Sequence, residues 1–327
     1  MKIVVMHSAD ALEPPVDPVL EQLRGAIEVC DHTVQLVPVD NKVEPLVDTL
    51  KAAAPDLVFN LAESFGGKSA LESNVAALLN LLGLRYTGSS PAGLLLAGDK
   101  SLTKKVLSFH SIRTPEFATV FRGALDWAGD IAFPLIVKPP QEDASLGISS
   151  NSVVNDLREL FTRIDELQTA FQQPVLVEQF VEGREFYVGV LGNANVRALP
   201  VMELDFSMFP AGVPRIASWE AKWGDDGAGS GEQFAGTRSV FPVDVKPELI
   251  ERMQQVAVEA FNALRLRDYA RIDLRVTDDE QIFVIEVNPN CYLERESEFA
   301  RAAAEGGMSY DALVARILEL ALGRYSR

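Results

Sequence analysis

The chain has 327 residues, of which 47% are hydrophobic and 24% charged, and a formal net charge of −17. This length is sufficient for two or three domains with a large buried core, and the composition argues against disorder, collagen-like repeats and coiled coil over most of the chain. An acidic surface repels phosphate backbones, so nucleic acid is disfavoured as a partner, although a local pocket can still bind a small anion.

Cysteine content and hydropathy bear on location. Cys30 and Cys291 are too few for a disulfide framework, which indicates a reducing compartment. The apolar run in MKIVVMHSAD is too short for a signal peptide, and the sequence has no run of about 18 uncharged apolar residues that would cross a membrane. We therefore expect a cytoplasmic protein without a membrane partner.

The first part of the chain alternates predicted strands with predicted helices. The strands are KIVVM, 33–39 and 57–61, and the helices are 19–29, 43–53 and about 70–82. Such alternation predicts a parallel sheet with helices on its faces. Ligands bind at the carboxyl ends of parallel strands, which here are the loops after Met6 and Leu61.

From about Asp99 the pattern changes to α+β. We predict a helix over 100–109, strands over 117–121, 134–138 and 148–153, and a helix to Phe171 with Asn155 as its N-cap. Strands over 175–181 and 185–191, joined by Glu182-Gly183, are expected to form a hairpin.

The C-terminal part contains a long irregular segment over 205–240, with four glycines between Gly224 and Gly231. A loop of this length is usually a lid or a disordered segment. The elements predicted after it are a helix over 247–264, strands over 270–276 and 282–288, and a helix over 309–322.

Two neighbouring strands near the C-terminus carry polar side chains on shared faces. Arg271 and Asp273 are two residues apart, as are Glu286 and Asn288, so each pair lies on one face of its strand. If the strands pair through the turn at 277–281, all of these side chains converge. Two carboxylates and an amide oxygen suit Mg²⁺ bound with substrate phosphates, and Arg271 can neutralise a phosphoryl group or an oxyanion.

Two further segments are suited to a nucleotide. The strand PLIVK ends in Lys138, which can reach an α- or β-phosphate, and the small-residue loop with Ser145 and Gly147 can fold over phosphates through its N–H groups. Glu178 ends one predicted strand and Glu185 begins the next; with the linker backbone they can bind adenine N6 and ribose hydroxyls. The sequence has no GxxxxGK[ST] loop.

Each segment alone also has an ordinary structural interpretation. The alternation around Asp273 is typical of the solvated face of a hairpin, although a strand that ends in Asn288-Pro289-Asn290 favours a site. Lys138 can extend from a strand end into solvent. Glu178 and Glu185 can be solvated acids that flank a turn.

In this order the three segments resemble those of the ATP-grasp enzymes, and more closely those of the D-alanine–D-alanine ligase family, over essentially the whole chain. The thirteen-residue spacing from Asp273 to Glu286 strengthens the resemblance. It implies an ATP-grasp fold of α/β and α+β class, with an N-terminal parallel α/β domain (1–92), a central α+β domain (93–176) and a C-terminal α+β domain (177–327). ATP is expected between the last two, under a lid at about 205–240.

The resemblance also implies roles for individual residues. The expected ATP-contacting residues are Lys100, Lys138, Glu178, Phe180, Val181 and Glu185. The expected Mg²⁺ ligands are Asp273, Glu286 and Asn288. The expected catalytic residues are Arg271 at the tetrahedral intermediate, Lys222 on a flexible loop near the γ-phosphate, and Ser145. Two Mg²⁺ ions are expected, and Mn²⁺ is an alternative.

The reaction implied by the resemblance joins two small molecules, a carboxylate and an amine. A carboxylate is a poor electrophile, so the γ-phosphoryl group of ATP is first transferred to it, and the amine then attacks the acyl phosphate. The lysines and Mg²⁺ offset the charge, and a closed lid keeps water out. A homodimer is a further expectation from the family.

The amino-acid side of the site departs from the family pattern. The segment after the first strand reads His7-Ser8-Ala9-Asp10 with Glu13 nearby, the family's paired serines become Ala144-Ser145, and its His-Gly becomes Ala62-Glu63. The turn after Asn288 reads PNCYLERES. We therefore predict that the ATP half is retained and that the substrates differ from D-alanine.

The acidic turn suggests one hypothesis about the substrate. Glu63, Glu294 and Glu296 can recognise a cationic amine and Arg295 a carboxylate; the alternative is the start of a solvated helix. Other functions also stay open: an authentic D-alanine–D-alanine ligase, a non-catalytic ATP-binding regulatory protein, or phosphoryl transfer without amide formation. Arg271 argues against simple binding, because an adenine site does not need it.

Overall fold

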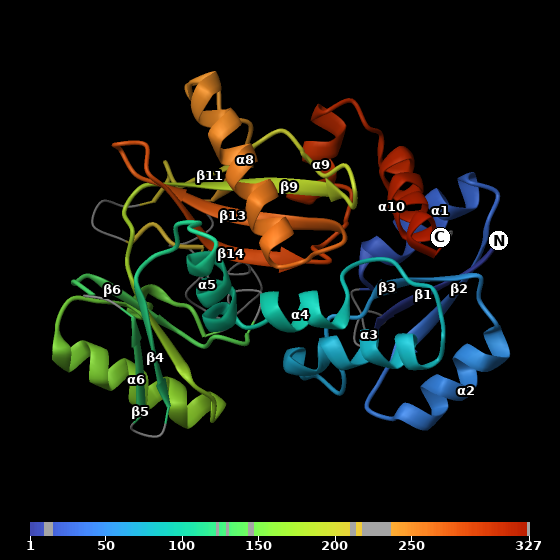
Figure 1. The fold of residues 1–327 in the computed structure, drawn as a ribbon, viewed down its shortest axis with the longest axis horizontal. Helices are drawn as coiled ribbons and strands as arrows, with labels where there is room; N and C mark the ends of the chain where they lie inside the picture. Colours follow the sequence, from blue (N-terminus) through green and yellow to red (C-terminus); the bar gives the residue numbers. More distant parts are fainter. Residues whose placement is uncertain are drawn as a thin grey trace.

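The structure is a computed structural model of the chain. It describes residues 1–9, 16–121, 124–128, 131–142, 147–209, 214–217 and 237–325. The strands form three sheets, which we call the N-terminal, central and C-terminal sheets (Figure 1). The N-terminal sheet lies at one end of the molecule, and the central sheet lies at the other, below the C-terminal sheet in this view.

The N-terminal sheet is parallel, as predicted, with the strand order β2-β1-β3. Its strands are β1 (Lys2–Ser8), β2 (Thr33–Val39) and β3 (Leu57–Leu61). Its helices are α1 (Pro18–Val29), α2 (Val43–Ala53) and α3 (Glu72–Leu81). Ile3 and Val5 of β1 pack on the α1 side, whereas Val4 and Met6 pack on the α2 and α3 side. Both faces of the sheet are therefore covered, as its apolar runs indicate.

The central sheet is antiparallel, with the strand order β5-β4-β8-β6-β7. Its strands are β4 (Phe117–Phe121), β5 (Ala124–Ala128), β6 (Leu135–Lys138), β7 (Val153–Val154) and β8 (Val175–Gln179). Helix α6 (Leu157–Phe171) packs Ile164 and Leu167 against this sheet, which gives it a small core of its own.

The C-terminal sheet is antiparallel, with the order β12-β11-β9-β13-β14 and β10 beside β9. Its strands are β9 (Arg184–Gly192), β10 (Arg197–Ala198), β11 (Met202–Asp205), β12 (Arg238–Val240), β13 (Asp268–Val276) and β14 (Ile282–Pro289). Its helices are α8 (Pro247–Ala263), α9 (Glu298–Glu305) and α10 (Tyr310–Tyr325). Helix α8 packs on one face and α9 and α10 on the other, where α10 meets α1, so a single core joins this sheet to the N-terminal sheet (Figure 1).

Two helices connect the N-terminal sheet to the central sheet: α4 (Pro91–Ala97) and α5 (Lys100–Phe109). Helix α5 is capped by Asp99, whose carboxylate accepts hydrogen bonds from the N–H groups of Ser101 and Leu102. This cap fixes the first turn of the helix. Lys100 and Lys104, one turn apart, therefore lie on the same face of α5.

The predicted hairpin over 175–181 and 185–191 is wrong. Strand β8 pairs with β4 and β6 in the central sheet, whereas β9 pairs with β11 and β13 in the C-terminal sheet. The connection between β8 and β9 therefore crosses from one sheet to the other. An apolar run identifies a strand, but its partner depends on residues far away in the chain.

Other local predictions also need correction. The predicted strand over 148–153 contains a 3₁₀ turn at Ser150–Ser152, and only Val153–Val154 pairs with β6. Helix α6 is capped by Asp156 rather than Asn155, because Asp156 Oδ1 accepts the N–H of Glu159 at 2.9 Å. Six further elements were not predicted: α4, β5, β10, β11, β12 and α9.

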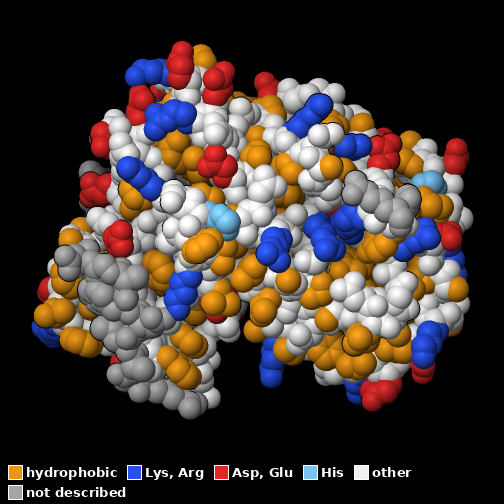
Figure 2. All heavy atoms as spheres, viewed as in Figure 1, with side chains coloured by type: hydrophobic (Ala, Val, Ile, Leu, Met, Phe, Trp, Pro, Cys, Tyr) orange, Lys and Arg blue, Asp and Glu red, His pale blue; other side chains and the backbone are white. Residues whose placement is uncertain are grey.

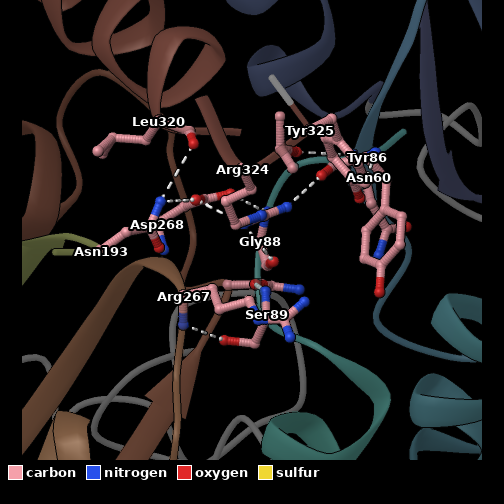
Figure 3. A network of polar contacts seen from close by, with 12 residues as sticks. Asn60, Tyr86, Gly88, Ser89, Asn193, Arg267, Asp268, Leu320, Arg324 and Tyr325 are labelled. Carbon is pink, nitrogen blue, oxygen red and sulfur yellow. Dashed lines mark hydrogen bonds and ion pairs between the residues drawn. The ribbon is translucent and has the colours of Figure 1, made fainter. Parts of the chain in front are cut away.

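A buried polar network joins the N-terminal sheet to the C-terminal sheet (Figure 3). Arg324 of α10 contacts Asp268 Oδ1 at 2.6 Å and donates to the carbonyl of Tyr86 at 2.6 Å. The other carboxylate oxygen of Asp268 accepts the N–H of Gly88 at 2.7 Å, and Oδ1 also accepts Asn193 Nδ2 at 2.8 Å. The segment after Tyr86 is thereby fixed to the start of β13.

The charge of the surface is unevenly distributed. On the face shown in Figure 2, several Lys and Arg side chains lie across the middle, whereas Asp and Glu lie mainly toward the upper and outer edges. The net charge of −17 therefore does not describe every part of this face. None of the helices in the described ranges is both long and apolar enough to span a membrane.

Candidate active site

Four of the predicted side chains converge on the paired strands β13 and β14. Arg271 lies opposite Asn288, and Asp273 lies opposite Glu286. Arg271 donates to both oxygens of Asp273, from Nε to Oδ1 at 2.8 Å and from Nη2 to Oδ2 at 2.9 Å. Asn288 Nδ2 donates to Asp273 Oδ2 at 3.0 Å. The predicted pairing is confirmed, and the metal-binding and catalytic roles of these residues stay predictions.

The donors at this position fit a divalent cation. Asp273, Glu286 and Asn288 supply two carboxylates and an amide oxygen, the hard donors that Mg²⁺ prefers. In the part of the chain that the structure describes, no group of three or more His, Cys, Asp or Glu side chains is arranged to hold a metal ion. With only three such donors, the coordination of a Mg²⁺ ion would be completed by phosphate oxygens and water.

Arg271 is held from several sides. Besides its two bonds to Asp273, Nη1 lies 3.3 Å from Glu298 Oε2, and the guanidinium carbon lies 4.7 Å from the centre of the Tyr187 ring. Burial lowers the pKa of Arg271, but the charges of Asp273 and Glu298 outweigh this effect and keep its pKa well above the usual value. Arg271 is thus a fixed cation, suited to stabilise an oxyanion.

Buried lysines link this centre to the central sheet. Lys100 Nζ lies 2.9 Å from Glu286 Oε1, whereas Lys138 and Lys104 lie 3.1 and 3.3 Å from Glu178 Oε1. Helix α5 therefore contacts β14 through Lys100 and β8 through Lys104. Lys104 was not among the predicted site residues, although its position one turn after Lys100 in KSLTKK was a usable signal.

Because of Lys104, the free energy of unfolding should change with pH in the alkaline range. Burial lowers the pKa of Lys104 to about 8 from 10.5, despite the nearby charge of Glu178. Between these values the folded protein binds fewer protons than the unfolded chain, so stability rises with pH in this window, by about 1.4 kcal/mol per unit at most. We expect the free energy of unfolding of the wild type, relative to Lys104→Met, to increase from about pH 8 to 10 in urea titrations. Parallel pH profiles for the two proteins would contradict this prediction.

Glu178 and Glu185 lie on different sheets, on either side of the β8–β9 connection. Glu178 is 1% exposed on β8, and Glu185 is 3% exposed on β9. In the connection, the N–H of Phe180 donates to the carbonyl of Pro134 at 2.9 Å. Val181, the next residue, is half-buried.

Glu185 has two buried partners that the sequence analysis missed. Arg275 Nη2 lies 2.7 Å from Glu185 Oε2, and the hydroxyl of Tyr187 donates to Glu185 Oε1 at 3.0 Å. Alternation is the signal that would have found Arg275, because it lies two residues after Asp273 on β13.

Gly183 in the same connection can only be glycine. Its φ is +149°, and an added Cβ would lie 2.1 Å from the carbonyl oxygen of Val276. We expect Gly183→Ala to lower the free energy of unfolding by about 2–4 kcal/mol, measured in urea. Gly67→Ala is the control, because its φ is +70° but nothing lies within 4 Å of the added Cβ, so it should lose only about 1 kcal/mol. Equal losses in the two variants would show that the clash with Val276 is unimportant.

Several predicted residues lie outside the described residues. These are the catalytic predictions Ser145 and Lys222, the neighbouring Ala144, and Asp10 and Glu13 after β1. Of the expected lid over 205–240, the structure describes only 205–209, 214–217 and 237–240, and the last of these contains β12.

The turn after β14 is attached to α1. Glu294 accepts hydrogen bonds on both carboxylate oxygens, from Gln22 Nε2 at 2.8 Å and from the N–H of Glu296 at 2.7 Å. Arg295 lies over the ring of Tyr310, with its guanidinium carbon 4.7 Å from the ring centre. Glu294 and Arg295 thus hold the turn in place. Burial raises the pKa of the Cys291 thiol, so this cysteine is unsuited to act as a nucleophile.

The chain matches a family model and curated relatives. The model "D-ala D-ala ligase C-terminus" matches residues 107–319. A D-alanine–D-alanine ligase of Desulfotalea psychrophila is 30% identical over 83% of this chain and 80% of its own length. An uncharacterised protein, y4sG, of Sinorhizobium fredii is 32% identical over 95% of this chain and 89% of its own length.

The fold also matches solved structures. A D-alanine–D-alanine ligase from Bacillus anthracis, in a crystal structure with ATP, aligns with a TM-score of 0.75 over 99% of this chain and 98% of that one, at 23% identity. That identity supports the fold alone, and the family assignment depends on the family model and the sequence relatives. The predicted fold class and family resemblance are confirmed: the chain belongs to the D-alanine–D-alanine ligase family and has its ATP-grasp fold.

Proposed function

We propose that this protein is an ATP- and Mg²⁺-dependent ligase that joins a small carboxylate to a small amine. The observation that carries the proposal is the convergence of Arg271, Asp273, Glu286 and Asn288 on β13 and β14, with Lys100 on Glu286. In this arrangement a fixed cation lies beside oxygen atoms that suit a metal ion, which supports the proposal. Membership in the D-alanine–D-alanine ligase family supports the same reaction class.

In the proposed reaction, the terminal phosphoryl group of ATP passes to the carboxylate, giving ADP and an acyl phosphate. The nitrogen of the amine then bonds to the acyl carbon, the bond to phosphate breaks, and the nitrogen loses a proton. Arg271 stabilises the negative oxygen of the tetrahedral intermediate, because its guanidinium is held by Asp273 and Glu298 before the reaction begins.

The remaining residues bind the nucleotide in this proposal. Lys100 and Lys138 contact its phosphates, Glu178 and the Phe180-Val181 backbone contact the adenine, and Glu185 contacts the ribose. A bound divalent ion, held by Asp273, Glu286 and Asn288, supplies Lewis-acid stabilisation of phosphate charge. We propose two Mg²⁺ ions, with Mn²⁺ as a substitute, and roles for Ser145 and Lys222 at the phosphates.

The D-alanine–D-alanine ligases among the relatives make D-alanine the first substrate to test. We propose a different amine or carboxylate, because Ala62-Glu63 and the turn after Asn288 depart from the family pattern. The decisive experiment supplies ATP and Mg²⁺ with a panel of amino acids and amines, and measures ADP release and product mass. D-Alanyl-D-alanine as the fastest product would overturn the substrate proposal, and no ADP release with any pair would favour a regulatory ATP-binding protein.

The sheets also support proposals about domains and assembly. The expected boundary between 176 and 177 falls inside β8, all of which pairs in the central sheet, so we propose that the C-terminal domain begins in the 180–183 connection. The N-terminal boundary near residue 92 falls at the start of α4. A homodimer and a cytoplasmic location, the latter supported by free Cys30 and Cys291, are also proposals.

A further inference from the structure

Arg275 is a buried side chain beside the predicted ribose-binding acid, and the proposed reaction does not use it. It is 5% exposed and lies directly opposite Glu185 in the pairing of β13 with β9. Its Nη2 lies 2.7 Å from Glu185 Oε2. Burying a lone carboxylate is costly, and the paired guanidinium offsets that cost.

Arg275 also holds two backbone segments that flank Glu185. Its Nη1 donates to the carbonyl of Gly183 at 3.1 Å and to the carbonyl of Arg215 at 3.0 Å. The first belongs to the β8–β9 connection and the second to the segment 214–217. The planar guanidinium presents several N–H groups in a fixed geometry, so one side chain fixes both segments relative to Glu185.

The other oxygen of Glu185 is fixed by Tyr187. Its hydroxyl donates to Glu185 Oε1 at 3.0 Å, and its ring lies under the guanidinium of Arg271. Each carboxylate oxygen can accept two hydrogen bonds, so Glu185 can still accept from a ligand.

We propose that Arg275 is a positioning residue that orients Glu185 to accept the hydroxyl groups of a ribose, and that it thereby makes the site selective for ribonucleotides over deoxyribonucleotides. This inference rests on the proposed function, because it takes the ligand to be an adenine nucleotide. Arg275 acts through Glu185 and through the carbonyls of Gly183 and Arg215. It therefore affects nucleotide recognition without touching the reacting atoms.

The test is calorimetric binding of ADP, 2′-deoxy-ADP and 3′-deoxy-ADP with Mg²⁺, because these nucleotides are not consumed. We expect the wild type to bind ADP about 10- to 100-fold more tightly than the weaker deoxy form, the usual effect of a hydrogen bond to a charged group. In Arg275→Met this ratio should fall to near one, and Arg275→Lys should restore part of it. Glu185→Gln should lose the ratio to the same extent.

Two variants keep the test interpretable. If Arg275→Met does not fold because Glu185 is left unpaired, Arg275→Lys carries the test: it keeps a cation beside Glu185 but lacks the planar fork, so its ratio should lie between one and the wild-type value. Arg184→Met is the control, since this partly exposed arginine contacts Glu203 and Asp244 and should leave the ratio unchanged.

The outcomes separate this inference from the proposed function. Absence of ADP binding by the wild type would overturn the proposed function, and the role of Arg275 with it. ADP binding with the wild-type ratio retained in Arg275→Met, or in Arg275→Lys where Arg275→Met does not fold, would overturn only the role of Arg275. An equal loss of affinity for all three nucleotides in Arg275→Met would indicate a purely structural role and would also overturn the inference.

Discussion

Replacing Asp273 with asparagine is expected to lower turnover by about 1,000-fold or more. Asp273 is 3% exposed, and its carboxylate receives two hydrogen bonds from Arg271 and one from Asn288. The substitution removes a negative charge from a site where a cation must bind and where Arg271 must be held. Both effects act on the transition state, in which charge on the transferred group is greatest.

The measurement is the rate of ADP release with the substrate pair that is fastest in the amino-acid and amine panel. Asp244→Asn is the matched control, because its side chain is 68% exposed and pairs with Arg184, which is itself partly exposed. It should retain the wild-type rate. Binding of ADP in EDTA should survive in Asp273→Asn, because Glu178 and Glu185 are unchanged.

Turnover of Asp273→Asn within about 10-fold of the wild type would contradict the assignment of Asp273 to the metal site. A wild-type protein without turnover, together with normal nucleotide binding in both proteins, would instead support a regulatory function. The same pair of proteins therefore distinguishes a ligase from a simple ATP-binding protein.

The site on β13 and β14 could be predicted because it depends on short-range geometry. The strands are separated only by a short turn, so alternation within each strand and pairing across the turn decide which side chains meet. Asp273 opposite Glu286 follows from these two rules. The irregularity between Asp273 and Leu274 could not be foreseen, but it lies beyond the Asp273–Glu286 pair and leaves it intact.

The partners of β8 and β9 could not be predicted by the same reasoning. Both segments are short and apolar, and a short connection between two such strands usually indicates a hairpin. Here the connection crosses between sheets, since β8 pairs with β4 and β6 whereas β9 pairs with β13. The ion pair of Arg275 with Glu185 could not be predicted either. It depends on the register between β9 and β13, and the two residues are 90 positions apart in the chain.

Replacing Arg324 with methionine is expected to lower the free energy of unfolding by about 3–5 kcal/mol. Its partner Asp268 is fully buried, at 0% exposure, so the substitution leaves an uncompensated carboxylate between the N-terminal and C-terminal sheets (Figure 3). The carbonyls of Tyr86 and Gly88 lose a donor as well. Removing the partner of a buried charge lowers the free energy of unfolding far more than removing one member of an exposed ion pair.

The measurement is the urea concentration at the unfolding midpoint, with Arg316→Met as the matched control on the same helix. Arg316 contacts Glu319 three residues away, and both side chains are exposed, so its removal should cost less than about 1 kcal/mol. Adding Asp268→Asn to Arg324→Met should recover part of the loss, because the buried negative charge is then absent. Equal midpoints for the Arg324 and Arg316 variants would contradict the prediction.

The pH dependence of the stability lost in Arg324→Met tests whether the charge of Asp268 causes that loss. Burial raises the pKa of Asp268 above its usual value, although Arg324 lowers it. Without Arg324 this pKa rises further, so the folded variant takes up a proton at mildly acidic pH where the unfolded chain does not. The deficit of Arg324→Met should therefore narrow as the pH falls from 7 to about 5, whereas the small deficit of Arg316→Met should not. A deficit that is constant with pH would indicate that lost packing, and not the charge of Asp268, accounts for the effect of Arg324.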